Sequence, residues 1–268
     1  MNPKSISIIN FVVVLAVIFC NYYFNAIGIN GNTVGSLSDQ YDNLFTPAGY
    51  AFAIWGLIFL SILVQAIFFL IRAFRPEKDQ TFIRQIGLRM AFANVLNIAW
   101  LFVWLNELTG VSVVIMLAFL ITLTAIILRL NMERWDAPLK VLAFVWWPIC
   151  LYSGWISVAT IANISAYLTK TGFTGGPFSE VTWATIMIVV ATLLALFMIY
   201  TRNMREFGAV VVWALVAIAV RHWGDIPLLQ YAALAGSAII LVASMVHASK
   251  YKATLPHKKL QQYLADKS

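Results

Sequence analysis

Tryptophan and phenylalanine residues recur at helical spacing inside the apolar stretches of this 268-residue chain. Phe52, Trp55 and Phe59 stand at i, i+3 and i+7, which places them on one face of a helix. An indole ring offers a flat stacking surface, and its N–H needs a hydrogen-bond partner when it is buried. Such residues stack on ligands and hold them, whereas catalysis needs a positioned acid, base or nucleophile. This stripe favours binding of a planar or rigid hydrophobic molecule.

Two further stripes add amide groups to the aromatic rings. The first contains Asn97, Trp100 and Trp104, and the second contains Tyr152, Trp155, Ala159 and Asn163. Asn97 and Asn163 are the most informative members, because an amide in an apolar helix must bond to a neighbouring helix or to a ligand. Two interpretations stay open. The stripes are interhelical packing with the amides as polar contacts, or they line an aromatic-walled small-molecule pocket.

The sequence lacks the groupings that several other activities require. No Asp or Glu lies well inside an apolar run, whereas proton- and sodium-coupled transporters usually carry such a carboxylate. There is no Walker loop, and His222, His247 and His257 do not have metal-ligand spacing. No nucleophile is paired with a base. We therefore predict no catalytic residues, no metal site and no required cofactor, and we expect that the protein is not an enzyme.

The elements that must hold the three stripes are transmembrane helices. The chain is 62% hydrophobic and 11% charged, with a mean hydropathy of +0.84, so lipid rather than water is its expected solvent. Continuous apolar runs of about 20 residues favour helices over a β-barrel. We predict an all-α polytopic membrane helix bundle of about eight transmembrane helices, over residues 6–24, 47–71, 90–106, 111–128, 139–167, 181–200, 207–220 and 228–247.

The basic residues predict how this bundle is oriented. With the N-terminus inside, all but two of the 18 Lys and Arg residues fall in inside segments; the exceptions are Lys170 and Arg221. Cytoplasmic loops carry such an excess, so we predict that both termini are cytoplasmic. The net charge of +7 then reflects topology rather than a nucleic-acid partner.

The predicted outside segments are rich in glycine and asparagine. Residues 25–46 form a turn-prone loop that is long enough to fold over the mouth of the bundle. Residues 171–178 separate the first five helices from the last three. The polar segment 221–225 is interpreted as a solvated turn with an Arg–Asp pair, and contact with a ligand head group is the alternative.

Three segments of the chain resemble the TspO/MBR (translocator protein / tryptophan-rich sensory protein) family. They are the proline-led segment 47–59, the Leu-Asn-x-x-Trp segment 96–100, and the Trp and Asn eight positions apart in 155–163. The resemblance covers about residues 6–168. It implies a five-helix bundle with a pocket for porphyrins or other tetrapyrroles, and in some members for sterols. Gly49 stands where the family has an upstream tryptophan, and no tryptophan precedes Trp55, whereas the family's first loop usually carries some. Tryptophan-dependent porphyrin breakdown is therefore not expected.

The resemblance also implies which residues line or brace the pocket: Trp55, Phe59, Asn97, Trp100, Trp155 and Asn163, to which the helical stripe adds Tyr152. We predict a TspO/MBR-like five-helix bundle over residues 1–170, and three additional transmembrane helices with a basic cytoplasmic tail over 171–268. This is a long form of the family with extra C-terminal helices.

The predicted function is binding or sensing of a tetrapyrrole-like ligand, of the porphyrin or haem type, or of another rigid hydrophobic molecule. The alternative is a carrier that moves a hydrophobic or neutral solute without ion coupling, and a third hypothesis is an enzyme that acts on a lipid or pigment. The expected partners are membrane lipid and a small porphyrin- or sterol-like ligand, with a homodimer left open and no nucleic acid. The expected location is a bacterial inner membrane.

Overall fold

The computed structural model describes residues 1–75, 78–173, 175–251 and 256–265, and these ranges contain helices and no strand. The helices are α1 (Pro3–Ile27), α2 (Val34–Gln40), η1 (Gly49–Ala53), α3 (Ile54–Ala73), α4 (Thr81–Ile86), α5 (Arg89–Leu105), α6 (Thr109–Arg129), α7 (Leu139–Val141), η2 (Leu142–Trp146), α8 (Trp147–Lys170), α9 (Glu180–Arg202), α10 (Arg205–Arg221), α11 (Pro227–Lys250) and α12 (Pro256–Ala265).

The prediction of a polytopic helical membrane bundle is confirmed. Six helical segments in the described ranges are long and apolar enough to cross a membrane: α1, η1 with α3, α6, α7 with α8, α9 and α11. Helices α5 and α10, each of 17 residues, lie alongside them. Each of the eight predicted segments therefore coincides with a helix, and the number that spans the bilayer stays a prediction.

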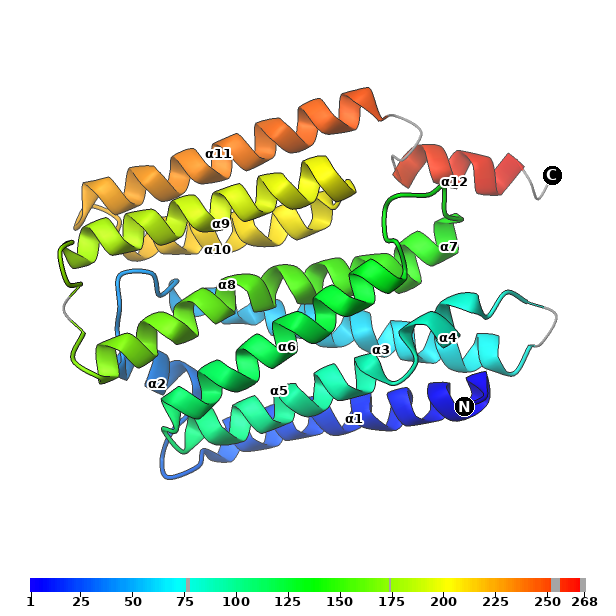
Figure 1. Ribbon diagram of the computed structural model, residues 1–268, viewed down its shortest axis with the longest axis horizontal. Helices are drawn as coiled ribbons and strands as arrows, with labels where there is room; N and C mark the ends of the chain where they lie inside the picture. Colours follow the sequence, from blue (N-terminus) through cyan, green and yellow to red (C-terminus); the bar gives the residue numbers. More distant parts are fainter. Residues whose placement is uncertain (76–77, 174, 252–255, 266–268) are drawn as a thin grey trace.

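Helix α8 lies at the centre of the bundle (Figure 1). It packs against α3 and α6 on one side and against α10 and α9 on the other. In the apolar part of the continuous segment Leu139–Lys170, 78% of the residues are buried, against 28–39% in the other five long apolar segments. A helix that is enclosed on all sides is the element best placed to carry an internal site.

Gly154 allows α8 and α10 to approach closely. A Cβ atom at this position would lie 3.0 Å from the Val210 Cβ and 3.2 Å from the Phe207 carbonyl oxygen. Transmembrane helices associate through such small residues, because lipid gives no hydrophobic drive for their association. The group α9–α11 is therefore packed directly on the helix that carries the Tyr152–Asn163 stripe.

A local change of helix geometry precedes this stripe. Pro148 lies near the start of α8. Its backbone nitrogen carries no hydrogen, so it cannot donate a hydrogen bond to the preceding turn. The chain accommodates it with a π-helical turn, η2, between α7 and α8. A π turn shifts the register of the residues that follow it, so it helps to set which face Tyr152 and Trp155 present.

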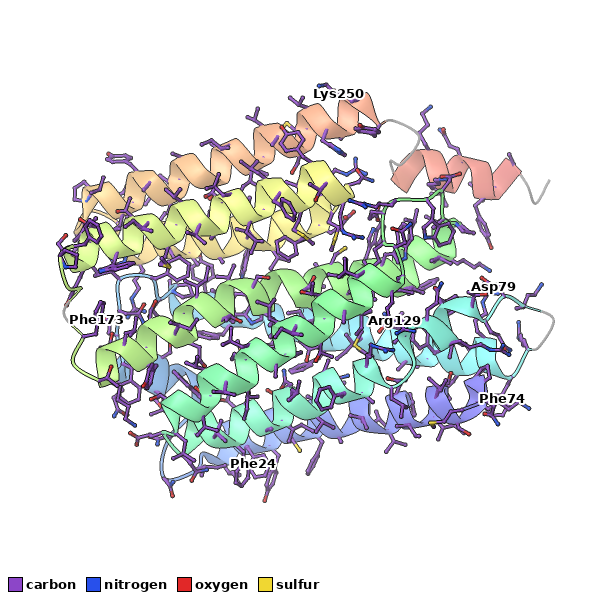
Figure 2. All side chains as sticks on the ribbon, in the orientation of Figure 1. Phe24, Phe74, Asp79, Arg129, Phe173 and Lys250 are labelled. Atoms are coloured by element: carbon purple, nitrogen blue, oxygen red, sulfur yellow. The ribbon has the colours of Figure 1, made fainter. Side chains whose placement is uncertain are left out.

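The two ends of the bundle differ in composition. The start of α1 and helix α12 lie at one end (Figure 1), where Asp79 is also found, while Phe173 lies at the opposite end (Figure 2). The basic loops gather at the first end, which is the predicted cytoplasmic end. The second end, called the outer end below, carries the loop between α1 and η1.

Residues 28–48, called the lid below, cross the outer end of the bundle. A turn with positive φ at Gly28, Asn30 and Gly31 reverses the chain after α1. The short helix α2 follows, and its N-terminus is capped by Thr33, whose side chain accepts from the Ser36 N–H. The lid was predicted as a loop; the short helix within it was not predicted.

Candidate functional site

The aromatic stripes of α3 and α8 face each other in the outer half of the bundle. Trp55 stacks on Phe59, with ring centroids 5.2 Å apart, and meets Tyr152 and Trp155 edge-on at 6.1 and 6.3 Å. Phe52 also meets Trp155 edge-on, at 6.0 Å. Offset and edge-on pairs at these separations are the favourable arrangements for aromatic rings. Four of the seven predicted site residues thus form one aromatic cluster.

A small cavity, called the inner cavity below, lies between this cluster, α5, α6 and the lid. Its volume is about 50 Å³, which is far below the several hundred cubic ångströms of a typical ligand pocket. The lining residues are Val34, Ser38, Asn43, Thr46, Pro47, Phe52, Trp55, Trp100, Trp104, Met116, Trp155, Val158, Ala159, Ala162, Asn163 and Ala166. The inner cavity is therefore too small for a drug-sized ligand as it stands, and five of the residues that line it belong to the lid.

A larger cavity, called the outer cleft below, opens between α1, α3 and the lid. Its volume is about 630 Å³, within the range of small-molecule sites. The lining residues are Ile18, Asn21, Tyr22, Asn25, Thr33, Val34, Gly35, Asp39, Gly49, Phe52, Trp55, Gly56, Phe59, Leu60, Leu63 and Trp100. Phe52, Trp55 and Trp100 line both cavities. These three rings form a wall between them, so a ligand in the outer cleft would contact the same aromatic cluster.

Trp155, which lines the inner cavity, has an unused hydrogen-bond donor. The residue is only 2% exposed, and its indole nitrogen has no hydrogen-bond partner among the described residues. A buried donor without a partner is unfavourable, and such groups are uncommon in folded proteins. A ligand with an acceptor atom in the inner cavity would satisfy it.

Asn163 joins three helices beside the inner cavity. Its side-chain oxygen accepts from the Trp100 indole N–H at 2.7 Å, and its amide nitrogen donates to the Ser112 hydroxyl at 2.8 Å. The bonds tie α8 to α5 and α6. Asn163 thus orients the Trp100 ring while its own side chain lines the cavity. Ser112 was not singled out from the sequence, although a hydroxyl near the start of an apolar run was a usable signal.

Asn97 and Tyr152 lie outside the lining of both cavities. The Asn97 oxygen accepts from the Asn21 amide at 2.8 Å, and its nitrogen donates to the Tyr152 hydroxyl at 3.1 Å. Tyr152 in turn donates to the Asn94 side-chain oxygen at 3.2 Å. The chain of polar groups connects α1, α5 and α8 within the core. For these two residues the structure favours the packing interpretation.

Replacing Asn97 with leucine distinguishes the two interpretations. The change removes one hydrogen bond from the Asn21 amide, which also donates to the Val17 carbonyl oxygen, and one from the Tyr152 hydroxyl, which also donates to Asn94. We therefore expect a loss of about 1–3 kcal/mol in stability. Thermal unfolding of detergent-solubilised protein measures this loss, and the affinity for protoporphyrin IX should stay within about twofold of the wild type. A large loss of affinity with unchanged stability would instead identify Asn97 as a ligand contact.

Glu107, in the turn between α5 and α6, holds one side of the lid. The Tyr41 hydroxyl donates to its carboxylate, as does the Asn32 amide at 3.3 Å, and the Lys170 ammonium lies 3.8 Å away. The Tyr41 bond, the Asn32 bond and the Lys170 charge hold the pKa of Glu107 below its usual range. A carboxyl group with a depressed pKa stabilises the folded state at pH values above its ordinary pKa. The Glu107 anchor therefore persists at neutral pH and weakens only in acid.

A second polar cluster lies at the opposite, predicted cytoplasmic end. Glu133, in the turn after α6, accepts from the Asn203 amide at 2.9 Å. Burial, followed by the charge of nearby Glu206, raises the pKa of Glu133 to about 8. Glu206 lies in the first turn of α10, which begins earlier than the predicted helix over 207–220. No carboxylate lies well inside an apolar run of the sequence, but this half-buried pair lies at the ends of two such runs and was not singled out.

The Glu133 carboxyl predicts how stability depends on pH. Its pKa is higher in the folded protein than the ordinary value of 4.5, so the folded state binds this proton more tightly than the unfolded chain. The free energy of unfolding should therefore fall as pH rises from 4.5 to about 8. In the Glu133→Gln variant, thermal unfolding across this window should show a smaller slope. The exposed Glu180→Gln variant is the matched control, and an equal slope in all three proteins would contradict the prediction.

Comparison with known proteins adds one result. The family model described as TSPO-like protein matches residues 7–246. The matched range includes α2 to α10 and most of α1 and α11, and it crosses the predicted boundary between residues 170 and 171. Searches of curated proteins and of solved structures found no match. The division of the chain into a five-helix unit and a three-helix unit stays a prediction.

Proposed function

Since the chain belongs to the TSPO-like protein family, we propose that it is an integral membrane protein that binds or senses a rigid hydrophobic ligand. The ligand class that we propose is a tetrapyrrole of the porphyrin or haem type, held against the aromatic cluster of α3, α5 and α8. The protein acts as a binding or sensory protein without catalysing a reaction, and we place it in a bacterial inner membrane.

The observation that carries the proposal is the shared aromatic wall of the two cavities. Phe52, Trp55 and Trp100 present ring surfaces to both the outer cleft and the inner cavity. Large flat rings with few polar groups are suited to a planar macrocycle, which stacks on them with little cost in side-chain entropy. The unpartnered indole N–H of Trp155 adds a donor for a polar edge of that ligand.

The depth of the cavities favours binding over transport. On η1 and α3, the residues that line the outer cleft extend from Gly49 to Leu63, so on α3 they lie in the half of the helix nearer the lid. Deeper in the bundle, Phe69, Val145 and Trp146 are almost completely buried and fill the core. A carrier needs a path to the other side of the membrane, and these side chains would have to move to create it.

Equilibrium binding tests the proposal against the carrier hypothesis. Purified protein in detergent is titrated with protoporphyrin IX, and binding is followed by the absorbance band of the porphyrin. We expect saturation at one ligand per chain, with competition by haem and weaker competition by a sterol. Non-saturating partition of the porphyrin into the detergent would contradict the proposal. In the same preparation, uptake of a neutral solute into reconstituted vesicles would support the carrier.

A further inference from the structure

The last turns of α10 contact the lid at the outer end of the bundle. The Arg221 guanidinium donates to Asp42 at 2.7 Å and to Asp39 at 3.4 Å, and it also lies 3.4 Å from the Pro47 carbonyl oxygen. Its side chain is 21% exposed, while the side chain of Asp39 is 71% exposed and that of Asp42 is 58% exposed. The arginine therefore lies beneath the lid, with the two acidic side chains reaching it from above.

Backbone groups of the lid and η1 extend this contact along one face of α10. The Ala48 N–H donates to the Ala217 carbonyl oxygen at 3.1 Å, and the Trp213 indole donates to the Ala51 carbonyl oxygen at 3.0 Å. Residues 213, 217 and 221 are spaced by four, so they share a helix face. Next to Arg221, the ring of His222 lies 2.9 Å from the Leu44 carbonyl oxygen.

These contacts matter because the lid forms part of both cavity walls. Val34, Ser38, Asn43, Thr46 and Pro47 line the inner cavity, and Asp39 lines the outer cleft. At about 50 Å³, the inner cavity admits a ligand only if its walls move. No helix is assigned between Gln40 and Gly49, so side-chain and backbone contacts with other elements must hold this part of the lid.

We propose that α10 clamps the lid through Arg221 and Ala217, and the adjoining η1 through Trp213, so that the α9–α11 group controls how fast a ligand enters and leaves the aromatic site. The control of ligand exchange rests on the proposed binding function. The clamp itself does not, because it is a property of the free protein. Glu107 holds the lid on the α5–α6 side and Arg221 holds it on the α10 side, and release of either anchor would open one edge.

Hydrogen–deuterium exchange of the full-length protein tests the clamp without any ligand. In the Arg221→Gln variant, which removes charge-assisted bonds to Asp39 and Asp42, amides of residues 34–48 should exchange about tenfold faster. The Arg129→Gln variant, at the exposed cytoplasmic end of α6, is the matched control and should match the wild type. The charge swap Arg221→Asp with Asp42→Arg should restore most of the protection. Lid exchange that is the same in Arg221→Gln as in the wild type would overturn the proposal.

A reversible crosslink tests the same clamp in the opposite direction. The hydrogen bond between Ala48 and Ala217 places their Cα atoms within about 7 Å, near the limit for a disulfide. In a Cys20→Ala background, the Ala48→Cys/Ala217→Cys variant should slow both protoporphyrin IX binding and release by tenfold or more, and a reductant should reverse this. Unchanged rates in the crosslinked protein would overturn control of ligand exchange by the lid. Absence of porphyrin binding to the wild type would instead refute the proposed function, while lid exchange would still report on the clamp.

Discussion

Replacing Trp155 with phenylalanine is expected to weaken protoporphyrin IX binding by about tenfold, with a moderate loss of stability because the smaller ring leaves part of a buried site unfilled. The indole N–H of Trp155 has no partner among the described residues, so removing it breaks no hydrogen bond in the free protein. In the complex, the substitution removes one hydrogen-bond donor to the ligand. A net hydrogen bond of about 1 kcal/mol corresponds to roughly a fivefold change in the dissociation constant. The smaller ring also gives up part of the stacking surface.

Absorbance titration in detergent measures the affinity of this variant, and thermal unfolding measures its stability. The Trp135→Phe variant is the matched control, since Trp135 is an exposed residue whose indole donates to the Leu130 carbonyl oxygen. It should bind protoporphyrin IX as the wild type does. Equal affinities for Trp155→Phe and the wild type would mean that the inner cavity is not part of the ligand site.

Replacing Gly154 with leucine is expected to disrupt the packing between α8 and α10. Even a Cβ atom at Gly154 would lie 3.0 Å from the Val210 Cβ, and the additional carbons of leucine have no space. Overpacking of this kind typically costs 1–3 kcal/mol, and separation of the helices would add lost contacts, so we expect about 3 kcal/mol or more. Thermal unfolding measures the loss.

The control for this change is Gly56→Leu, because a Cβ at Gly56 meets no atom within 4 Å. It should leave stability nearly unchanged, while its side chain would narrow the outer cleft that Gly56 lines. The Gly154→Leu variant should also lose protection of the lid, since α10 carries Arg221. A Gly154→Leu protein as stable as the wild type would contradict the close approach of the two helices.

Much of the bundle is predictable from apolar runs alone, because lipid leaves the backbone few alternatives to helices. The first run was predicted over residues 6–24, and α1 extends from Pro3 to Ile27. The grouping of the aromatic residues into one stripe on each of α3 and α8 was also predictable. The spacing of Trp55 and Trp155 places each in a stripe on one face of its own helix, and in the bundle the two stripes pack together.

The sequence did not reveal how the polar groups pair. Asn97 and Asn163 look alike as amides in apolar helices, yet Asn163 lines the inner cavity and Asn97 bonds to Asn21 and Tyr152. Spacing along one helix gives a direction around its axis, and it does not say which neighbour lies in that direction. A signal was available in Asn94, which lies three residues before Asn97 on the same face.

The role of the C-terminal helices was the least predictable feature. Arg221 was interpreted as part of a solvated turn, and Asp225 lies only four residues away. In the structure, Arg221 binds Asp39 and Asp42, which precede it by about 180 residues in the chain. A contact this distant in sequence depends on how α10 packs on α8, which local patterns do not encode.

Quenching of tryptophan fluorescence by protoporphyrin IX tests the central claim most directly, because quenching depends on the distance from the ligand to each indole. The Trp55→Phe/Trp155→Phe variant removes two indoles of the site, and the Trp135→Phe/Trp223→Phe variant removes two exposed ones. If the ligand occupies the aromatic site, quenching of the wild type is saturable, and the amplitude falls far more in the first variant than in the second. Quenching that is linear with porphyrin concentration, or that falls equally in both variants, would contradict a site between α3, α5 and α8.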